Sequence, residues 1–392
     1  MLSIFKINTN PEKRYFGFDI IRAFSVILVM NMHFLELFSP SIGINFFMIP
    51  LPDPVDMFFV CSGFLIGYQH LKDIHKMDKV TPKYTARFLV MRWVRTLPSY
   101  YIILTLIVLL GALVTHNLDF PIRNYLFIQN LYEQRSKVFR ETWTISIEEW
   151  FYFTFPIFFY IISTLLNVNK KKSFLYILII YIVVCNLLKM HYYFNVYPTH
   201  DFRQWIDFRE LVVLRIDTIA IGLLGAYVCY FYEDFWERNK YRFLPYGLVI
   251  YFGSIFFYWS WVNFLQDNEF ATFYHFTFYY LVSPVSIVLC LPYLKTIKFK
   301  NNFVNHFVLY TSLISYSLFL FHLSLVMLIL FAIYLGVIKQ ITSTYMLYAF
   351  TGFIYLLWLF LTFYLSNLFF NKIELPIMNK RRWIIEKLKL ND

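Results

Sequence analysis

Charged residues are scarce in this sequence of 392 residues. Asp, Glu, Lys and Arg make up 15% of the chain, whereas a typical soluble domain carries about 25%. Hydrophobic residues reach 59% and aromatic residues 22%, and the mean hydropathy is +0.55. A chain of this composition has too few polar side chains to cover its surface in water. The scarcity of charge therefore excludes a soluble globular protein and indicates one that lies in a lipid bilayer.

Cysteine is also sparse, and its positions exclude a disulfide framework. The four cysteines, Cys61, Cys185, Cys229 and Cys290, lie far apart within apolar runs, and we expect them to be small buried residues. No cluster has the spacing of a metal site, so we expect no metal cofactor. The first apolar run is too long for a cleavable signal peptide. Because no repeat or low-complexity tract interrupts the chain, we expect residues 1–392 to form a single integral-membrane domain.

Long apolar runs, in contrast, recur along the whole chain. A run of about 20 residues crosses a bilayer as a helix, and backbone groups cannot stay unpaired in lipid. Ten such runs can be identified: 15–38, 50–70, 96–115, 143–166, 173–190, 211–232, 243–262, 273–292, 309–336 and 345–370. Charged residues weaken the apolar pattern of the second and the sixth of these runs. The sequence predicts an all-α, polytopic membrane helix bundle with about ten transmembrane helices.

The positions of Lys and Arg predict how this bundle is oriented. If the N-terminus lies in the cytoplasm, the inner segments hold 25 of the 35 basic residues and the outer segments hold eight. This is the bias of the positive-inside rule, and it predicts that both termini are cytoplasmic. The net charge of +11 is thus spread over short inner loops. We therefore expect the lipid bilayer, and no nucleic acid, as a partner.

The first apolar run carries a stripe of ionisable side chains, which are rare in membrane helices and usually functional. At about 100° per residue, Asp19, Arg22, His33 and Glu36 fall on one helix face. Arg22 and His33 are separated by about 16 Å along the axis, so the stripe runs from the inner leaflet toward the outer half. Buried polar groups that hold helices together are the structural alternative. Four ionisable residues on one face favour a functional site.

Two further polar groups lie near the second and third runs. Asp56 opens the second run, and Ser62 with Gly63 offers a place for close helix approach. Arg92 and Arg95 lie in the expected inner loop before the third run, three positions apart, so both guanidinium groups can converge on one anion. Their alternative role is that of a topology anchor at a helix entrance.

The later runs add acids and other polar residues. Glu148 and Glu149 are adjacent in the fourth run, below the expected outer surface, and we expect only one of them to face the bundle interior. The sixth and ninth runs contain Arg215, Asp217, Tyr316 and His322. For each of these four, taken alone, a structural and a functional role are equally open.

Taken together and in order, six segments resemble acyltransferase family 3, the bacterial membrane O-acyltransferases. They are Phe18–Ala23 with His33, Asp56–Ile66, Arg92–Pro98, Trp143–Tyr152 with Pro156, Arg215–Asp217 with Gly222, and Ile314–Tyr316 with His322. The chain departs from the family pattern at Thr144, where Ser is usual, and at Trp150, where Gln is usual. Some members carry an extracytoplasmic SGNH-type domain, which we expect to be absent here.

The resemblance implies a reaction and a place for it. The donor would be acyl-CoA, commonly acetyl-CoA, in the cytoplasm, and the acceptor a hydroxyl group of an envelope carbohydrate, at the bacterial cytoplasmic (inner) membrane. Arg92 and Arg95 would then bind the donor. Arg22 would position the donor or stabilise the oxyanion.

For the acceptor side of this reaction, the expected positions of His33 and Glu148 in the outer half of the bundle suggest a mechanism. His33 would act as general base on the acceptor hydroxyl, oriented by Glu148 or Glu36, and an acyl-His33 intermediate stays open. The remaining polar residues would support the site: Asp19, Glu36, Asp56, Ser62, Glu149, Arg215, Asp217, Tyr316 and His322.

Several alternatives stay open at this point. The acceptor could be a lipid or a small diffusible molecule instead of a carbohydrate. A proton-coupled transporter also places ionisable residues in helices, but it has little need for a CoA-binding arginine pair. A purely structural scaffold leaves the charged stripe unexplained. A second copy of the chain and a glycan-assembly protein are both open as partners.

Overall fold

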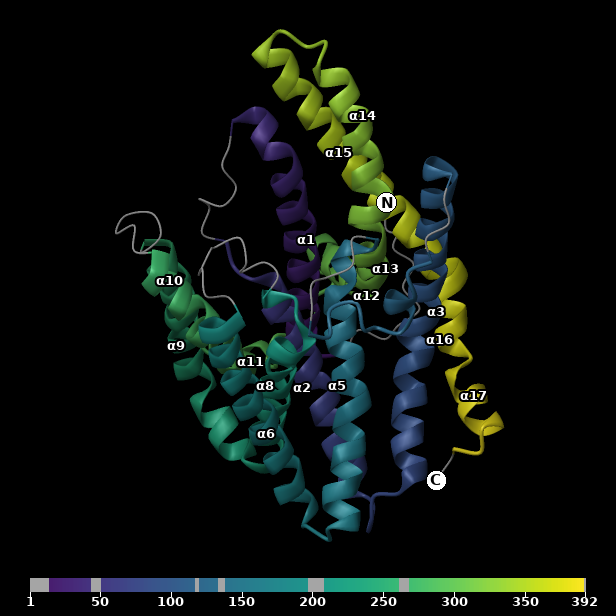
Figure 1. The fold of residues 1–392 in the computed structure, drawn as a ribbon. Coiled ribbons are helices and arrows are strands. Elements are labelled where there is room, and N and C mark those ends of the chain that lie inside the picture. Colours follow the sequence, from purple (N-terminus) through teal and green to yellow (C-terminus); the bar gives the residue numbers. More distant parts are fainter. Residues whose placement is uncertain are drawn as a thin grey trace.

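The computed structural model describes residues 14–43, 51–116, 120–132, 138–196, 208–260 and 268–390. Within these ranges every regular element is a helix, and no strand occurs. The elements form the elongated helix bundle shown in Figure 1. The predicted all-α class is therefore confirmed.

Most of the helices lie within the predicted apolar runs. They are α1 (Phe16–Phe38), α2 (Pro54–His75), α3 (Pro82–Thr115), α5 (Trp143–Tyr160), α6 (Lys170–His191), α8 (Val212–Phe231), α9 (Glu233–Ser260), α11 (Tyr280–Leu294), α12 (Phe303–Leu313), α13 (Ser315–Phe321), α14 (Leu328–Ile338) and α15 (Thr344–Phe369). Short helices complete the bundle: α4 (Ile122–Tyr125), α10 (Asn268–Tyr274), α16 (Leu375–Asn379) and α17 (Arg381–Lys387).

Nine helical segments of the described chain are long and apolar enough to cross a membrane. The predicted second run, now α2, is not among them, because polar residues such as Asp56, Gln69 and His70 lower its hydropathy. Helix α2 instead lies inside the bundle, where Phe59 and Val60 are fully buried. Other helices, not lipid, surround it, which explains why it tolerates the polar residues.

Helix α3 begins 14 residues earlier than the predicted run, so the expected inner loop before it is largely helical. Thr81 caps this helix by accepting a hydrogen bond from the Tyr84 N–H, and Pro82 occupies its first turn. At 34 residues, α3 is about 51 Å long, well beyond the thickness of a bilayer core. The arginine pair therefore lies on a continuous helix, which also contains Pro98.

The predicted ninth run is interrupted twice. Helix α12 ends at Leu313, and α13 starts at Ser315 after Ile314 has left helical geometry. A π-helical segment, His322–Met327, then separates α13 from α14. Wide π turns inside helices frequently occur at functional sites. Both interruptions fall next to polar residues that the sequence singled out.

Glycines let α2 and α8 pack with their backbones in direct contact. A Cβ atom added at Gly63 would overlap the carbonyl oxygen of Ile219, and one added at Gly222 would overlap that of Val60. Small residues at such crossings are typical of membrane helix pairs, because they allow close van der Waals packing. The close approach predicted at Gly63 is therefore confirmed.

The helices fall into two groups that meet near α1. Buried residues of α1, α3, α13, α14 and α15 form one hydrophobic core, and those of α2, α5, α6 and α8 form another. In Figure 1, α6, α8, α9 and α11 lie on one side of the molecule, and α3, α15 and α16 lie on the other. The α2–α3 and α5–α6 connections lie at one end and the α14–α15 connection at the opposite end. This alternation agrees with the predicted topology, whose inner and outer sides stay a prediction.

Candidate active site

The ionisable stripe of α1 faces the broken helix that runs from α12 into the π-helical segment. Three contacts join the two: Ser312 Oγ donates to Asp19 Oδ1 at 2.7 Å, Arg22 Nη2 donates to Ser315 Oγ at 3.3 Å, and His33 Nδ1 lies 2.8 Å from His322 Nε2. The residue numbers rise together along both segments, so the segments run parallel. The predicted common face of Asp19, Arg22 and His33 is therefore confirmed. Glu36 forms an ion pair with Arg140 at 2.7 Å.

The hydrogen bonds of the histidine pair define its tautomers. His322 Nδ1 lies 2.7 Å from the carbonyl oxygen of Phe319, and a carbonyl can only accept, so Nδ1 carries the proton. In a pair of neutral imidazoles, Nε2 of His322 is then the acceptor for the Nδ1 proton of His33. This assignment leaves Nε2 of His33 without a proton. That nitrogen can accept a proton or attack an electrophile.

Packing and further hydrogen bonds hold His322 in place. The two imidazole rings stack with their centroids 5.1 Å apart, and the indole of Trp358 donates to the backbone oxygen of His322 at 2.9 Å. Buried Glu141 accepts hydrogen bonds from both the N–H and the hydroxyl of Ser324, which lies in the same π-helical segment. Glu141 was missed in the sequence, because it lies in a stretch that was expected to be an outer loop.

Three arginines gather at the other end of the stripe. Arg22 of α1 and Arg92 of α3 both interact electrostatically with Arg95 of α3. All three side chains are only partly buried. The guanidinium of Arg92 also stacks over the ring of Tyr152, 5.5 Å from its centroid. The like charges of the three arginines repel one another, and Glu148 and Glu374 offset part of this repulsion at Arg95. Guanidinium groups gathered in this way can also bind phosphate groups of a polyanion.

Both acids of the predicted pair approach these arginines from α5. Glu149 is buried and accepts a hydrogen bond from Thr96 of α3 at 2.7 Å. Glu148 is partly buried and interacts electrostatically with all three arginines. The expectation that only one acid faces the interior is therefore wrong: both carboxylates are directed toward α3. One buried oxygen of each has no hydrogen-bond partner among the described residues.

Helix α13 connects the site through three successive side chains. Ser315 accepts from Arg22 of α1, and the Tyr316 hydroxyl donates to the Thr96 carbonyl of α3 at 2.9 Å. Ser317 donates to Glu374 at 2.5 Å. Successive helical residues point about 100° apart, so one turn of α13 reaches three different elements. Tyr316 thus joins α13 to α3 beside the arginine pair, and its supporting role stays a prediction. Glu374 was missed, because the sequence beyond residue 370 was interpreted only as a basic inner segment.

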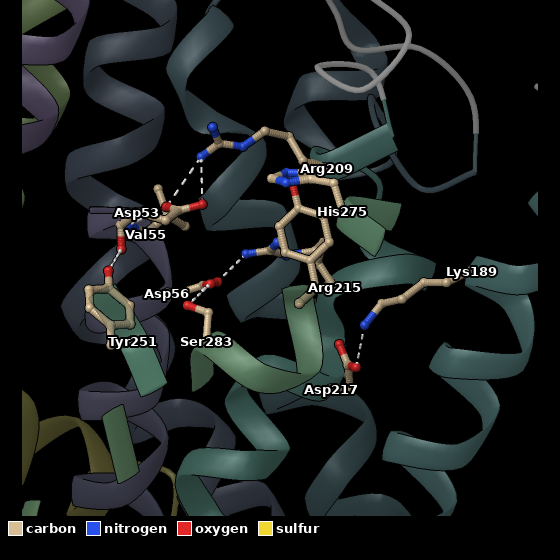
Figure 2. Close-up of polar contacts among 11 residues, drawn as sticks. Asp53, Val55, Asp56, Lys189, Arg209, Arg215, Asp217, Tyr251, His275 and Ser283 are labelled. Atoms are coloured by element: carbon tan, nitrogen blue, oxygen red, sulfur yellow. Dashed lines mark hydrogen bonds and ion pairs between the residues drawn. The ribbon is translucent and has the colours of Figure 1, made fainter. Parts of the chain in front are cut away.

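The remaining predicted site residues form a second polar cluster on the other side of the bundle (Figure 2). Arg215 of α8 donates to Asp56 of α2, which also accepts from Ser283 of α11 at 2.7 Å. Lys189 of α6 pairs with Asp217 of α8 at 2.6 Å. The structure therefore groups Asp56, Arg215 and Asp217 with α6, α8 and α11, and not with the arginine cluster.

This second cluster has the features of a structural network. Asp56, Lys189, Arg215 and Asp217 are all fully buried, and a buried charge is tolerated only when it is paired. The guanidinium of Arg215 also lies 3.8 Å from the ring centroid of Tyr280. The two ion pairs link α2 to α8 and α6 to α8. A supporting role of Asp56, Arg215 and Asp217 in the reaction stays a prediction.

Three further expectations concern Ser62, the four cysteines and possible metal ligands. Ser62 lies partly buried on α2 beside Gly63, and its supporting role stays a prediction. All four cysteines are buried and unbridged, as expected of small apolar residues. Among the described residues, no three His, Cys, Asp or Glu side chains are placed to hold a metal ion.

Comparison with known proteins identifies the family. A family described as an acyltransferase domain matches residues 15–365, which include α1, both arginines of α3, the acidic pair of α5 and His322. No curated protein and no solved structure matches the chain significantly. The matched region covers most of the chain and contains all six motif segments. The chain therefore belongs to acyltransferase family 3 and is a multi-pass membrane acyltransferase.

Proposed function

We propose that this protein transfers an acyl group, an acetyl group in the first instance, from cytoplasmic acyl-CoA to a hydroxyl group of an envelope carbohydrate. One observation carries the proposal. A single face of α1 supplies His33 to a hydrogen-bonded histidine pair toward one end and Arg22 to an arginine cluster toward the other. The predicted topology places the arginine end toward the cytoplasm. The bacterial inner membrane is the location that this reaction implies.

The arginine cluster suits the anionic part of the donor. CoA carries several phosphate groups, and arginine binds phosphate through charge-assisted, often bidentate hydrogen bonds. Arg22, Arg92 and Arg95 would hold these phosphates near the inner end of the bundle. The narrow pantetheine arm would then extend along α1 toward His33, which lies about 16 Å farther along the helix axis. In this proposal the thioester would lie near the unprotonated nitrogen of His33.

The chemical step follows from the tautomers of the histidine pair. The acceptor oxygen attacks the thioester carbonyl carbon, and its proton passes to Nε2 of His33. The C–O bond forms, the C–S bond breaks, and the leaving thiolate takes the proton from His33. Nδ1–H of His33 donates to His322 throughout, so His322 orients the base and stabilises the imidazolium. This role replaces the one considered for Glu148 or Glu36.

A covalent route uses the same nitrogen. Nε2 of His33 would attack the thioester first, expel the thiolate and form an acyl-His33 intermediate, which the acceptor hydroxyl then cleaves. Exchange of labelled CoA into unlabelled acetyl-CoA in the absence of acceptor separates the routes. Exchange that is lost in His33→Ala indicates the covalent route, and no exchange by the wild type indicates direct transfer.

The proposed function is tested with radiolabelled acetyl-CoA and membranes that contain the protein. Extracted envelope glycans, membrane lipids and small hydroxylated metabolites serve as separate acceptors. We expect label in the glycan fraction, released by mild base as expected for an ester. Label confined to lipid or to small molecules would replace the acceptor class. Substrate flux into sealed vesicles without any new covalent bond would indicate a transporter and contradict the proposal.

A further inference from the structure

The chain beyond the family match contributes to the same site. The match ends at residue 365, but the helix continues through a π-helical segment, Phe370–Glu374, into α16 and α17. All three of these short elements pack against α3, the helix that carries the arginine pair. Figure 1 shows α16 and α17 beside α3. We call residues 370–387 the C-terminal segment.

Glu374 anchors this segment inside the bundle. Its side chain is buried, with an exposed fraction of 3%, and it accepts the 2.5 Å hydrogen bond from Ser317 of α13. The carboxylate also attracts Arg95 and Arg22 electrostatically. A buried acid is costly unless it is paired in this way. Glu374 therefore ties the C-terminal segment to both α13 and the arginine cluster.

Arg381 extends the cluster from the same segment. It is the first residue of α17, its side chain is partly buried, and it interacts electrostatically with Arg92 of α3. A fourth cation beside three others is unfavourable unless negative charge balances it, and around Arg92 the carboxylates of Glu148 and Glu149 supply part of that charge. Phosphate groups of a bound anion would add to it. The neighbours of Arg381 at this turn, Lys380 and Arg382, are exposed. Arg381 is thus directed toward α3, whereas its basic neighbours are not.

We propose that the C-terminal segment completes the donor site, with Arg381 as a phosphate-binding residue for CoA and Glu374 as the positioning residue that holds the segment on α13. This inference rests on the proposed function, because it takes acyl-CoA as the donor. It adds a binding element that lies beyond the residues matched by the family, 15–365. The segment forms one wall of the site on the side that the topology assigns to the cytoplasm.

The test is equilibrium binding of tritiated CoA to the full-length protein in lipid nanodiscs at two NaCl concentrations. The variants are Arg381→Gln and its matched control Lys380→Gln, which removes the same charge from the adjacent exposed position. We expect Arg381→Gln to raise the Kd for CoA about tenfold, as for loss of one charge-assisted hydrogen bond, and to flatten its salt dependence. Lys380→Gln should change the Kd by less than about twofold.

A second variant, Glu374→Lys, tests the positioning role. An added positive charge would tighten CoA binding if Glu374 acted only through the general field of the cluster. We expect weaker binding instead, because the introduced lysine repels Arg22 and Arg95 and displaces the segment; thermal unfolding of each variant monitors its fold. Equal Kd values for Arg381→Gln and wild type, or tighter binding by Glu374→Lys, would overturn the inference. If the wild type itself failed to bind CoA, the proposed donor would be wrong, and the inference with it.

Discussion

The structure gives His322 a specific partner that the sequence did not indicate. In the sequence it is one polar residue in an apolar run, 289 positions from His33. In the structure its Nε2 accepts a hydrogen bond from Nδ1–H of His33, and its own Nδ1–H donates to the carbonyl oxygen of Phe319. In the mechanism that we propose, a neutral imidazole would perform the orienting task that a carboxylate performs in many hydrolases.

Replacement of His322 separates this orienting role from general packing. His322→Phe fills the space but cannot accept a hydrogen bond, so we expect kcat to fall about 10²-fold, the lower range for general-base catalysis. His322→Gln offers a carbonyl oxygen to Nδ1 of His33 and should retain more of the activity. The measurement is steady-state acetyl transfer with KM for donor determined in parallel. Equal losses in both variants would mean that His322 only fills space.

The arginine pair makes a separate residue-scale prediction. Arg95→Ala removes a charge-assisted contact to phosphate, so the KM for acyl-CoA should rise about tenfold or more while the KM for acceptor stays constant. Arg95→Lys should recover only part of this loss, because lysine cannot bind phosphate bidentately. Lys372→Ala, at an exposed position of the C-terminal segment, is the control. An unchanged KM for acyl-CoA in Arg95→Ala would mean that the two arginines only fix the orientation of the helix in the membrane.

Part of the site could be predicted residue by residue, and part could not. The stripe of α1 was predictable because helix periodicity alone places Asp19, Arg22 and His33 on one face. The partners were not, because Glu141 and Glu374 are brought to the site by contacts across 183 and 57 positions. No local pattern distinguishes such acids from loop or tail residues. A carboxylate among the basic residues of the C-terminal segment was the one visible hint.

At the scale of elements, the crossing of α2 and α8 depends on glycine. Gly222→Ala introduces a Cβ atom against the Val60 backbone, which cannot move without displacing α2. We expect a loss of about 1–3 kcal/mol of stability, typical of overpacking, and a lower Tm in detergent. Gly253→Ala is the matched control, since its new methyl group meets no atom within 4 Å, and it should be neutral or slightly stabilising. A normal Tm in Gly222→Ala would show that the crossing can relax.

The ion pair of α2 and α8 gives a second prediction for these elements. Asp56→Ala leaves the buried guanidinium of Arg215 without its partner carboxylate, and such losses cost about 3–5 kcal/mol. Asp56→Ala combined with Arg215→Leu removes both charges and should recover much of that stability. Thermal unfolding of the two single variants and the double variant provides the cycle. Additive losses would contradict the structural role assigned to this pair.

Element boundaries show where hydropathy stops being informative. The extra turns of α3 before residue 96 contain one lysine and three arginines among apolar residues, so a search for apolar runs stops at these charges and not where the helix begins. The two breaks between α12 and α14 lie within one apolar run whose polar residues carry no formal charge, so mean hydropathy did not reveal them. Helix geometry near the site is set by contacts with α1 and α3, which only the folded chain provides.

At the scale of the whole molecule, the helix class and number were predictable because the bilayer acts on each segment separately. Every span must satisfy its own backbone and match the same thickness, whatever its neighbours are. The grouping of spans was not predictable, because it depends on which polar faces meet. The sequence treated Asp56, Arg215 and His33 as one site, whereas the structure divides them between two clusters.

The predicted orientation is tested with introduced cysteines, since all four native cysteines are buried. Tyr345→Cys lies at the start of α15, where the native side chain is 87% exposed. We expect it to react with a membrane-impermeant thiol reagent added outside intact cells. Lys83→Cys, exposed at the start of α3, should react only after permeabilisation. The reverse pattern would invert the topology and place the arginine cluster on the wrong side for cytoplasmic CoA.

The most direct test of the central claim is acetyl transfer by His33→Ala. The comparison uses purified protein in proteoliposomes, labelled acetyl-CoA and the acceptor fraction, with His191→Ala at an exposed position of α6 as control. We predict that His33→Ala folds, binds CoA with near-normal affinity and transfers at least about 10²-fold more slowly, whereas His191→Ala behaves like wild type. Transfer at the wild-type rate by His33→Ala would contradict a catalytic role for His33.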